Sequence, residues 1–137
     1  MFSIEVDIRS PGTGGRRAVI ADDDPDQRAA LARHLAERGF AVSEVLNGFE
    51  ALSVIGAEAP CVALMRRRMA EDDGERAAAL ASMLYPRTRI ILTTNDPALA
   101  QPGLAQPGLT AENSPFTVLA RPVDLALLDR CLDGLAA

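Results

Sequence analysis

Hydrophobic residues gather in five short runs along the chain, and longer segments with helical spacing separate these runs. We interpret the runs as strands, because the last three lack polar alternation, as strands do when both of their faces are covered. Alternating strands and helices of this length predict an α/β fold whose parallel sheet has right-handed crossovers and helices on both faces. The runs cover residues 18–21, 40–45, 61–65, 90–92 and 116–120.

The segments between the runs carry signals for helix ends. Asp24 followed by Pro25 predicts a helix start, and Gly39 predicts where that helix stops. Asn47 with Glu50 predicts a second start of the capping-box type. Three apolar residues mark a third helix that ends before Pro86, and Asp124 can cap a last helix with a leucine stripe. The marking residues are Ala77, Leu80 and Leu84, and the stripe is Leu125, Leu128, Leu132 and Leu135.

One helix of the alternating pattern is in doubt. The segment 99–108 repeats Leu-Ala-Gln-Pro-Gly, and its two Pro-Gly steps are incompatible with a regular helix. We therefore expect the fourth helix to be short or lost. Residues 1–15 end in a glycine-rich link and are predicted to form an N-terminal tail, disordered or paired as an edge strand. Residues 16–137 are predicted to form one domain.

Composition narrows the functional classes. The net charge is −5, which argues against nucleic acid as the main partner, although all 14 basic residues are arginine. No apolar run approaches the length of about 20 residues that crosses a membrane, and the N-terminus does not resemble a secretory signal, so we expect a cytoplasmic location. Cys61 and Cys131 have no metal-ligand spacing and are expected to be reduced thiols.

Polar residues follow four of the predicted strands, at the edge where open α/β sheets bind their ligands. Three aspartates, residues 22–24, follow the first strand, and three arginines, residues 66–68, follow the third. Thr93 and Thr94 follow the fourth strand, and Arg121 follows the fifth. Any chemistry of this chain should therefore take place among these side chains.

Four segments carry a resemblance to the receiver domain of bacterial two-component response regulators, over about residues 16 to 135. They are the first strand with its acidic residues, a Met-Ala-Glu-Asp-Asp-Gly stretch, an Ile-Ile-Leu-Thr strand and a Leu-Ala-Arg-Pro strand end. The resemblance implies a flavodoxin-like, doubly wound sheet of five parallel strands in the order 2-1-3-4-5, and a role in phosphorelay signal transduction. The four segments cover residues 19–26, 69–74, 90–93 and 119–122.

The chain departs from this family where the chemistry occurs. The family places its phosphoacceptor aspartate three residues before the methionine of its Met-Pro pair, and that position is Arg66 here. The lysine that the family has before proline is Arg121, and the aromatic switch position is Val118. Of the usual set, the acidic pair Asp22 and Asp23 remains, together with the hydroxyl of Thr93, or of Thr94 if the register shifts by one.

These departures suggest a pocket without catalysis. Arginine cannot attack phosphorus, stays protonated and repels a nearby Mg²⁺. Our hypothesis is that Arg66, together with Arg121, pairs with Asp22 and Asp23 and takes the place of a metal. No cofactor is then expected, and Mg²⁺ would bind weakly if Asp22 and Asp23 retain it. In the alternative interpretation Arg66 points into solvent and the pocket, which includes Thr93, has merely decayed.

Other constellations have more ordinary interpretations. The three aspartates also resemble the Asp-x-Asp of haloacid-dehalogenase-like phosphatases, but those enzymes need a lysine that this chain lacks. Asp72 and Asp73 have the carboxylates of alternative phosphate acceptors, but we expect them to cap the third helix, whose N-terminus favours negative charge. The arginines 66–68 are weak evidence for a nucleic-acid surface, and His34 is expected at the surface or between helices.

The leading interpretation is an atypical receiver that is not phosphorylated, is not an enzyme and acts as a module for contacts with an unknown signalling protein. One alternative is a response regulator that is switched by a ligand or by phosphate on another residue. A second alternative is a structural dimerisation module, in which the partner is another copy of the chain. Neither nucleic acid nor a membrane is an expected partner.

Overall fold

The computed structural model describes residues 16–68, 74–95 and 116–133. Each of the five predicted strands is present, with ends within about two residues of the hydrophobic runs. Strands and helices alternate along these residues as expected, except between β4 and β5, where the intervening segment lies outside the described residues. The elements are β1 (Arg17–Ala21), α2 (Pro25–Glu37), β2 (Ala41–Val45), α3 (Gly48–Glu58), β3 (Val62–Arg66), α4 (Gly74–Leu84), β4 (Arg89–Thr94), β5 (Thr117–Ala120) and α6 (Leu125–Asp133).

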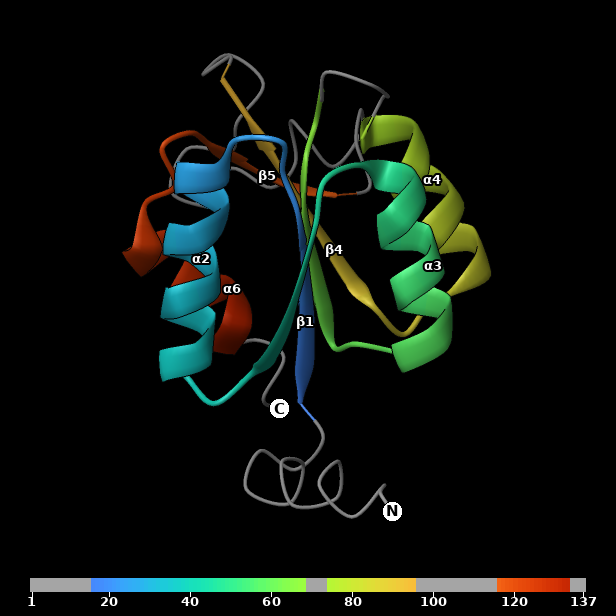
Figure 1. Cartoon of the computed structure of the whole chain (residues 1–137), viewed down its shortest axis with the longest axis horizontal. Helices are drawn as coiled ribbons and strands as arrows, with labels where there is room; N and C mark the ends of the chain where they lie inside the picture. The colour runs from blue at the N-terminus through green and yellow to red at the C-terminus, as the bar shows by residue number, and fades with distance from the viewer. Residues whose placement is uncertain (1–15, 69–73, 96–115, 134–137) are drawn as a thin grey trace.

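The five strands form one parallel sheet in the order β2-β1-β3-β4-β5. Helices α2 and α6 cover one face of this sheet, and α3 and α4 cover the other (Figure 1). The predicted fold class and strand order are thus confirmed. The expected short or missing fourth helix falls on residues 96–115 and the expected tail on residues 1–15, and both lie outside the described residues.

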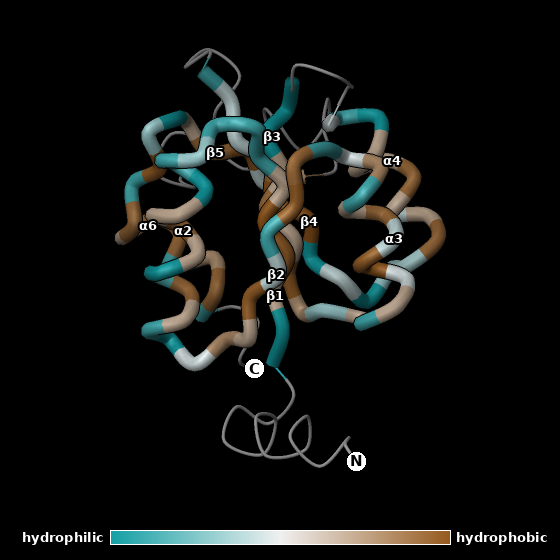
Figure 2. The backbone as a smooth tube through the Cα atoms, viewed as in Figure 1, coloured by the Kyte–Doolittle hydropathy of each residue, from teal (hydrophilic) through white to brown (hydrophobic). Residues whose placement is uncertain are grey.

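Each face of the sheet has its own hydrophobic core, because neighbouring residues of a strand point to opposite faces. Ile20 and Leu64 contribute to the core under α2 and α6, whereas Val19 and Met65 contribute to the core under α3 and α4. In Figure 2 the central strands are coloured largely brown, for hydrophobic, as expected when both of their faces are covered. With both faces covered, the exposed edge at the strands' carboxyl ends is left for polar chemistry.

The predicted helix ends are found with small differences. Asp24 caps α2 by accepting hydrogen bonds from the backbone N–H groups of Asp26 at 3.0 Å and Gln27 at 3.3 Å. Asn47 caps α3 through the N–H of Glu50, and the Glu50 carboxylate accepts from the N–H of Leu46, one residue before the position typical of a capping box.

The third predicted helix, α4, is present and ends before Pro86, but it is oriented differently from what its leucines suggest. Leu80 and Leu84 are 44% and 61% exposed. The helix packs on both the sheet and α3, and a face of small residues allows this close approach. That buried face consists of Gly74, Ala77, Ala78 and Ala81.

The two cysteines are free thiols in the structure. Cys131 is buried in the core under α2 and α6, and this burial raises the pKa of its thiol. Cys61 is only partly buried. Among the described residues, no helix combines the length and the apolar character that a membrane crossing requires.

Helices α2 and α6 are joined by a group of charged side chains. His34 Nε2 lies 2.7 Å from Asp129 Oδ1, and Arg38 lies 3.0 Å from Asp129 and 2.9 Å from Asp133. His34 therefore takes the helix–helix position that was one of its two expected places. The hydrogen bond from His34, together with its charge and that of Arg38, lowers the pKa of Asp129, although partial burial opposes this shift.

This group gives a pH-dependent contribution to stability. Because the folded-state pKa of Asp129 is lowered, its contribution is present above the unfolded-state pKa and is lost as the pH falls through the folded-state value. The variant Asp129→Asn should be less stable than the parent chain by about 0.5–1 kcal/mol near pH 5, and the difference should be smaller near pH 3, below the unfolded-state pKa. Urea unfolding at both pH values measures it. A difference that is constant over this range would contradict the assignment.

The last helix offers a matched pair of leucines for measuring core packing. Leu128 is fully buried, whereas Leu125, on the same helix, is 40% exposed. Leu128→Ala should lower the free energy of unfolding by about 3 kcal/mol, because it removes packed methyl groups and leaves a cavity. Leu125→Ala should cost less than about 1 kcal/mol. Equal losses in chemical denaturation would show that α6 is not docked as described.

Candidate functional site

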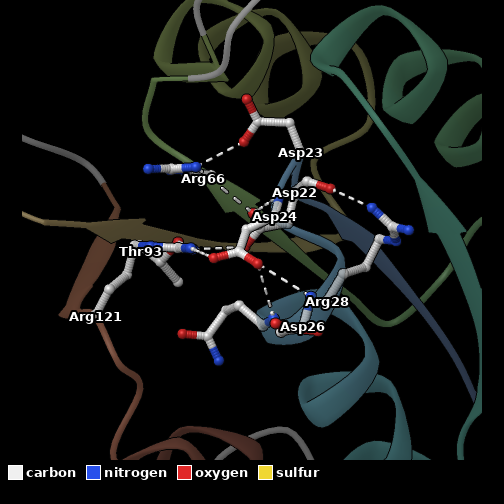
Figure 3. A network of polar contacts seen from close by, with 9 residues as sticks. Asp22, Asp23, Asp24, Asp26, Arg28, Arg66, Thr93 and Arg121 are labelled. Atoms are coloured by element: carbon white, nitrogen blue, oxygen red, sulfur yellow. Dashed lines mark hydrogen bonds and ion pairs between the residues drawn. The ribbon is translucent and has the colours of Figure 1, made fainter.

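The predicted site residues converge at the carboxyl edge of the sheet. Asp22 directly follows β1, Arg66 is the last residue of β3, and Arg121 directly follows β5. Arg66 and Thr93 are register partners on neighbouring strands. The order of the parallel strands brings these chain segments to one place, as the close-up in Figure 3 shows.

Asp22 is the centre of the site. Its side chain is 2% exposed, and both of its carboxylate oxygens have a protein donor. Oδ1 accepts from the backbone N–H of Asp24 at 2.9 Å, and Oδ2 accepts from Arg121 at 2.5 Å. The Arg121 guanidinium, 5% exposed, also lies 3.3 Å from Thr93 Oγ1 and 3.6 Å from Asp24. A buried carboxylate is thus matched by an almost equally buried cation.

Arg66 adds a second cation to the acidic pair. Its guanidinium donates to Asp23 Oδ1 at 2.7 Å and lies 4.0 Å from Asp22 Oδ1. The side chains of Arg66 and Asp23 are about one-quarter exposed, so this contact is at the surface of the pocket. Figure 3 shows Arg66 reaching toward Asp23 while Arg121 approaches Asp22 from the side of Thr93.

The charges of the site are compensated by its own residues. Burial of charge costs several kcal/mol per ion unless pairing and hydrogen bonds compensate for it. Here each acidic side chain has a cation or an N–H group, and among the described residues no buried side-chain nitrogen or oxygen lacks a partner. The residues therefore form a network that needs no additional ion to satisfy it.

These residues do not fit a magnesium ion. Mg²⁺ needs oxygen ligands in near-octahedral geometry, and the oxygens of Asp22 and one oxygen of Asp23 already accept from the protein. A dication about 4 Å from a guanidinium is repelled by about 8 kcal/mol at an effective dielectric constant of 20. Within the described part of the chain, no group of three or more His, Cys, Asp and Glu side chains is arranged to hold a metal.

Sequence reasoning missed Arg28 and did not include Asp24 in the predicted set of paired residues. Arg28 donates to the backbone carbonyl of Asp22 at 2.9 Å and to Glu44 at 3.1 Å. Asp24 both caps α2 and lies close to Arg121. The signal for Arg28 was its place one turn after the helix start, since helical side chains lean toward the N-terminus of their helix.

The remaining candidates lie at the edge of the site or outside the described residues. Arg67 pairs with Glu75 at 3.1 Å, and Arg68 is exposed. Thr94, which a shifted register would have placed in the site, is buried at the end of β4 and bonds through its carbonyl to the N–H of Arg121. Asp72 and Asp73 lie outside the described residues.

Comparisons with known proteins agree with this architecture. The family model of the response regulator receiver domain matches residues 18–112. A curated relative, the probable transcriptional regulatory protein NarL of Mycobacterium tuberculosis, is 36% identical over 87 residues, which are 61% of this chain and 40% of the relative. The chain thus spans well under half the length of the curated relatives that it matches.

Solved structures show the same fold. The signal receiver domain of the putative response regulator NarL from Mycobacterium tuberculosis is 26% identical, with a TM-score of 0.66 over 89% of this chain and 97% of that one. A CheY-like receiver from Methanospirillum hungatei is 22% identical, with a TM-score of 0.72 over 88% and 94%. Thermotoga maritima TrrA, solved with Mg²⁺ and BeF, is 20% identical, with a TM-score of 0.71 over 88% and 98%.

The buried pair of Asp22 and Arg121 can be tested by a double-mutant cycle. Arg121→Met should destabilise the chain by about 3–5 kcal/mol, because it leaves a carboxylate with 2% exposure without its main cation. The double variant Asp22→Asn with Arg121→Met should lose clearly less than the sum of the two single losses. Urea unfolding supplies all four free energies.

Arg38, which pairs with Asp129 and Asp133 and is 29% exposed, provides the control. Arg38→Met should cost about 1 kcal/mol or less, since a partly exposed ion pair contributes little. The central role of the buried pair is wrong if Arg121→Met costs no more than this control.

Proposed function

The chain belongs to the response regulator receiver domain family, and from this premise we propose that it is a receiver that accepts no phosphoryl group and acts through contacts with a protein. The observation that carries this proposal is Arg66. It occupies the position at which the resemblance places the phosphoacceptor aspartate, and its guanidinium donates to Asp23.

Two physical arguments support the loss of phosphorylation. A receiver needs a carboxylate nucleophile for phosphoryl transfer, and the guanidinium at the end of β3 has no nucleophilic electron pair at neutral pH. In addition, Arg66 and Arg121 supply the positive charge that a bound metal would otherwise bring to Asp22 and Asp23. Asp22 and Asp23 are already matched by cations of the chain, and the end of β3 presents no carboxylate that could accept a phosphoryl group.

The family and the surface both support a role in protein contacts. Receiver domains are signalling modules rather than typical enzymes, and they work by contacting other proteins. Leu46 and Phe49 are 52% and 79% exposed, and they follow β2 at the same edge as the acidic pair. Exposed apolar side chains of this size next to a polar network suit a protein interface. We propose a cytoplasmic signalling protein as the partner, with a second copy of the chain as the alternative.

The proposal makes a prediction about phosphorylation. In the presence of Mg²⁺ and acetyl phosphate, the parent chain should gain no phosphate by intact-mass measurement. Arg66→Asp returns a carboxylate to the end of β3 and changes the local charge by two units, so this variant should bind Mg²⁺ at least about tenfold more tightly than the parent chain. It should also become measurably phosphorylated.

Arg67→Asp is the matched control, because it makes the same change of charge one residue further on, where the parent side chain pairs with Glu75. It should stay without phosphate. Phosphate on Asp22 or Asp23 of the parent chain would refute the proposal, as would equal phosphorylation of the two variants.

A further inference from the structure

A pocket of about 440 Å³ opens between the ends of β3 and β4, beside the network of Asp22 and Asp23. Its volume lies within the range of pockets that hold small molecules. The described residues that line it are Arg66, Arg67, Arg68, Thr93, Thr94 and Asn95. The acidic pair is not among them.

The residues that line the pocket are rich in hydrogen-bond donors. The described ones carry three guanidinium groups, two hydroxyls and one amide, and none of them carries a carboxylate. Thr93 and Thr94 are buried, so β4 holds their side chains in defined positions. Donors with positive charge, gathered in a concave site, favour a ligand with several anionic oxygens.

The charges next to the pocket do not cancel this preference. Asp23 pairs with Arg66 and Glu75 pairs with Arg67, whereas Asp22 is matched by Arg121. Among the described residues, the three arginines of the lining against the neighbouring Asp23 and Glu75 leave one positive charge, although the net charge of the chain is −5. Each guanidinium has five N–H donors, so one ion pair does not exhaust it. Figure 3 shows one end of the Arg66 guanidinium at Asp23 and the other pointing away from the acidic pair.

From this geometry we propose that the pocket is a non-covalent binding site for a small phosphate-bearing molecule. A phosphate group presents three or more oxygens to the converging donors, whereas a carboxylate presents two. The concave shape favours a small ligand over a nucleic-acid strand, whose backbone needs an extended basic track. The site depends on the arginines and threonines of the pocket and not on whether the chain accepts a phosphoryl group, so it can fail independently of the proposed function.

Arg66 belongs to both the pocket and the acidic network. An anion that draws this guanidinium competes with Asp23 for the same side chain. Ligand binding is therefore coupled to the arrangement of the acidic pair, which gives a receiver without a phosphoacceptor a way to respond to a signal.

Titration of the full chain, followed by NMR, tests the site. Inorganic pyrophosphate and adenosine diphosphate should shift the backbone resonances of residues 66–68 and 93–95 in a saturable manner. Adenosine, which has no charge, should not shift them, and citrate should bind at least about tenfold more weakly than pyrophosphate. Tighter binding of the diphosphate nucleotide than of pyrophosphate would identify a nucleotide as the source of the phosphate, and equal binding would identify the phosphate group alone.

The double variant Arg67→Gln with Arg68→Gln should weaken pyrophosphate binding by at least about tenfold, because it removes two cations from the lining. Arg33→Gln with Arg130→Gln is the control of equal charge. Both of its residues are exposed, on α2 and α6, and its affinity should match that of the parent chain. Asn95→Ala removes an exposed donor from the rim at constant charge, and it should weaken binding about two- to fivefold even if the arginine variant folds poorly.

Three outcomes would overturn the proposal. The first is a titration that does not saturate or shifts resonances elsewhere. The second is an equal loss of affinity in the control variant. The third is citrate binding as tight as that of pyrophosphate, since this would show a general response to negative charge rather than recognition of phosphate.

Discussion

The buried carboxylate of Asp22 is the constraint on which the site depends. The fold places it at the end of a central strand, 2% exposed, where water cannot solvate its charge. An unpaired charge in that position would cost several kcal/mol, so the structure has to provide a cation. Arg121 provides it from 99 residues further along the chain, at the end of the last strand. The ends of β1 and β5, which are not neighbours in the sheet, are thereby linked by a single ion pair.

The origin of that cation decides how the domain can behave. A metal ion or a phosphoryl group can arrive and leave, and each event changes the charge balance at the strand ends. Arg66 and Arg121 are part of the chain, so the charge that they contribute is permanent. Under the proposed function, a site balanced in this way gains stability in one arrangement but lacks the change of charge that a phosphorylation switch uses. On that proposal, signalling rests on partner contacts or on another ligand.

The sequence predicts what local chemistry determines and misses what depends on distant neighbours. Strand positions and the cap at Asp24 follow from hydrophobic runs and from a side chain that bonds the backbone nearby. The buried face of α4 could not be found in the same way, because alanines there are selected by the closeness of α3 and the sheet. A leucine such as Leu84 has the right chemistry for a core, yet that contact leaves no room for it.

The candidate site likewise has one part that the sequence predicts and one part that it does not. That two arginines and two aspartates meet follows from their positions after parallel strands. The pairing of each arginine with its aspartate could not be predicted from these positions. It depends on the register of β3, β4 and β5, which brings Arg121 to Asp22 and Arg66 to Asp23. Arg28 was missed because its acceptor in the site is the backbone carbonyl of Asp22, so only its position one turn after the helix start pointed to the network.

The two arginines consequently have different roles, although both pair with the same acidic pair. Arg121 is 5% exposed and cannot leave Asp22 without exposing a buried charge, so it is structural. Arg66 is 24% exposed, and its partner Asp23 would regain water if the pair opened. The cost of separating this second pair is close to that of a surface ion pair, about 1 kcal/mol or less. On our proposal, a ligand in the neighbouring pocket would need little binding energy to draw Arg66 away, and the buried pair would keep the fold intact.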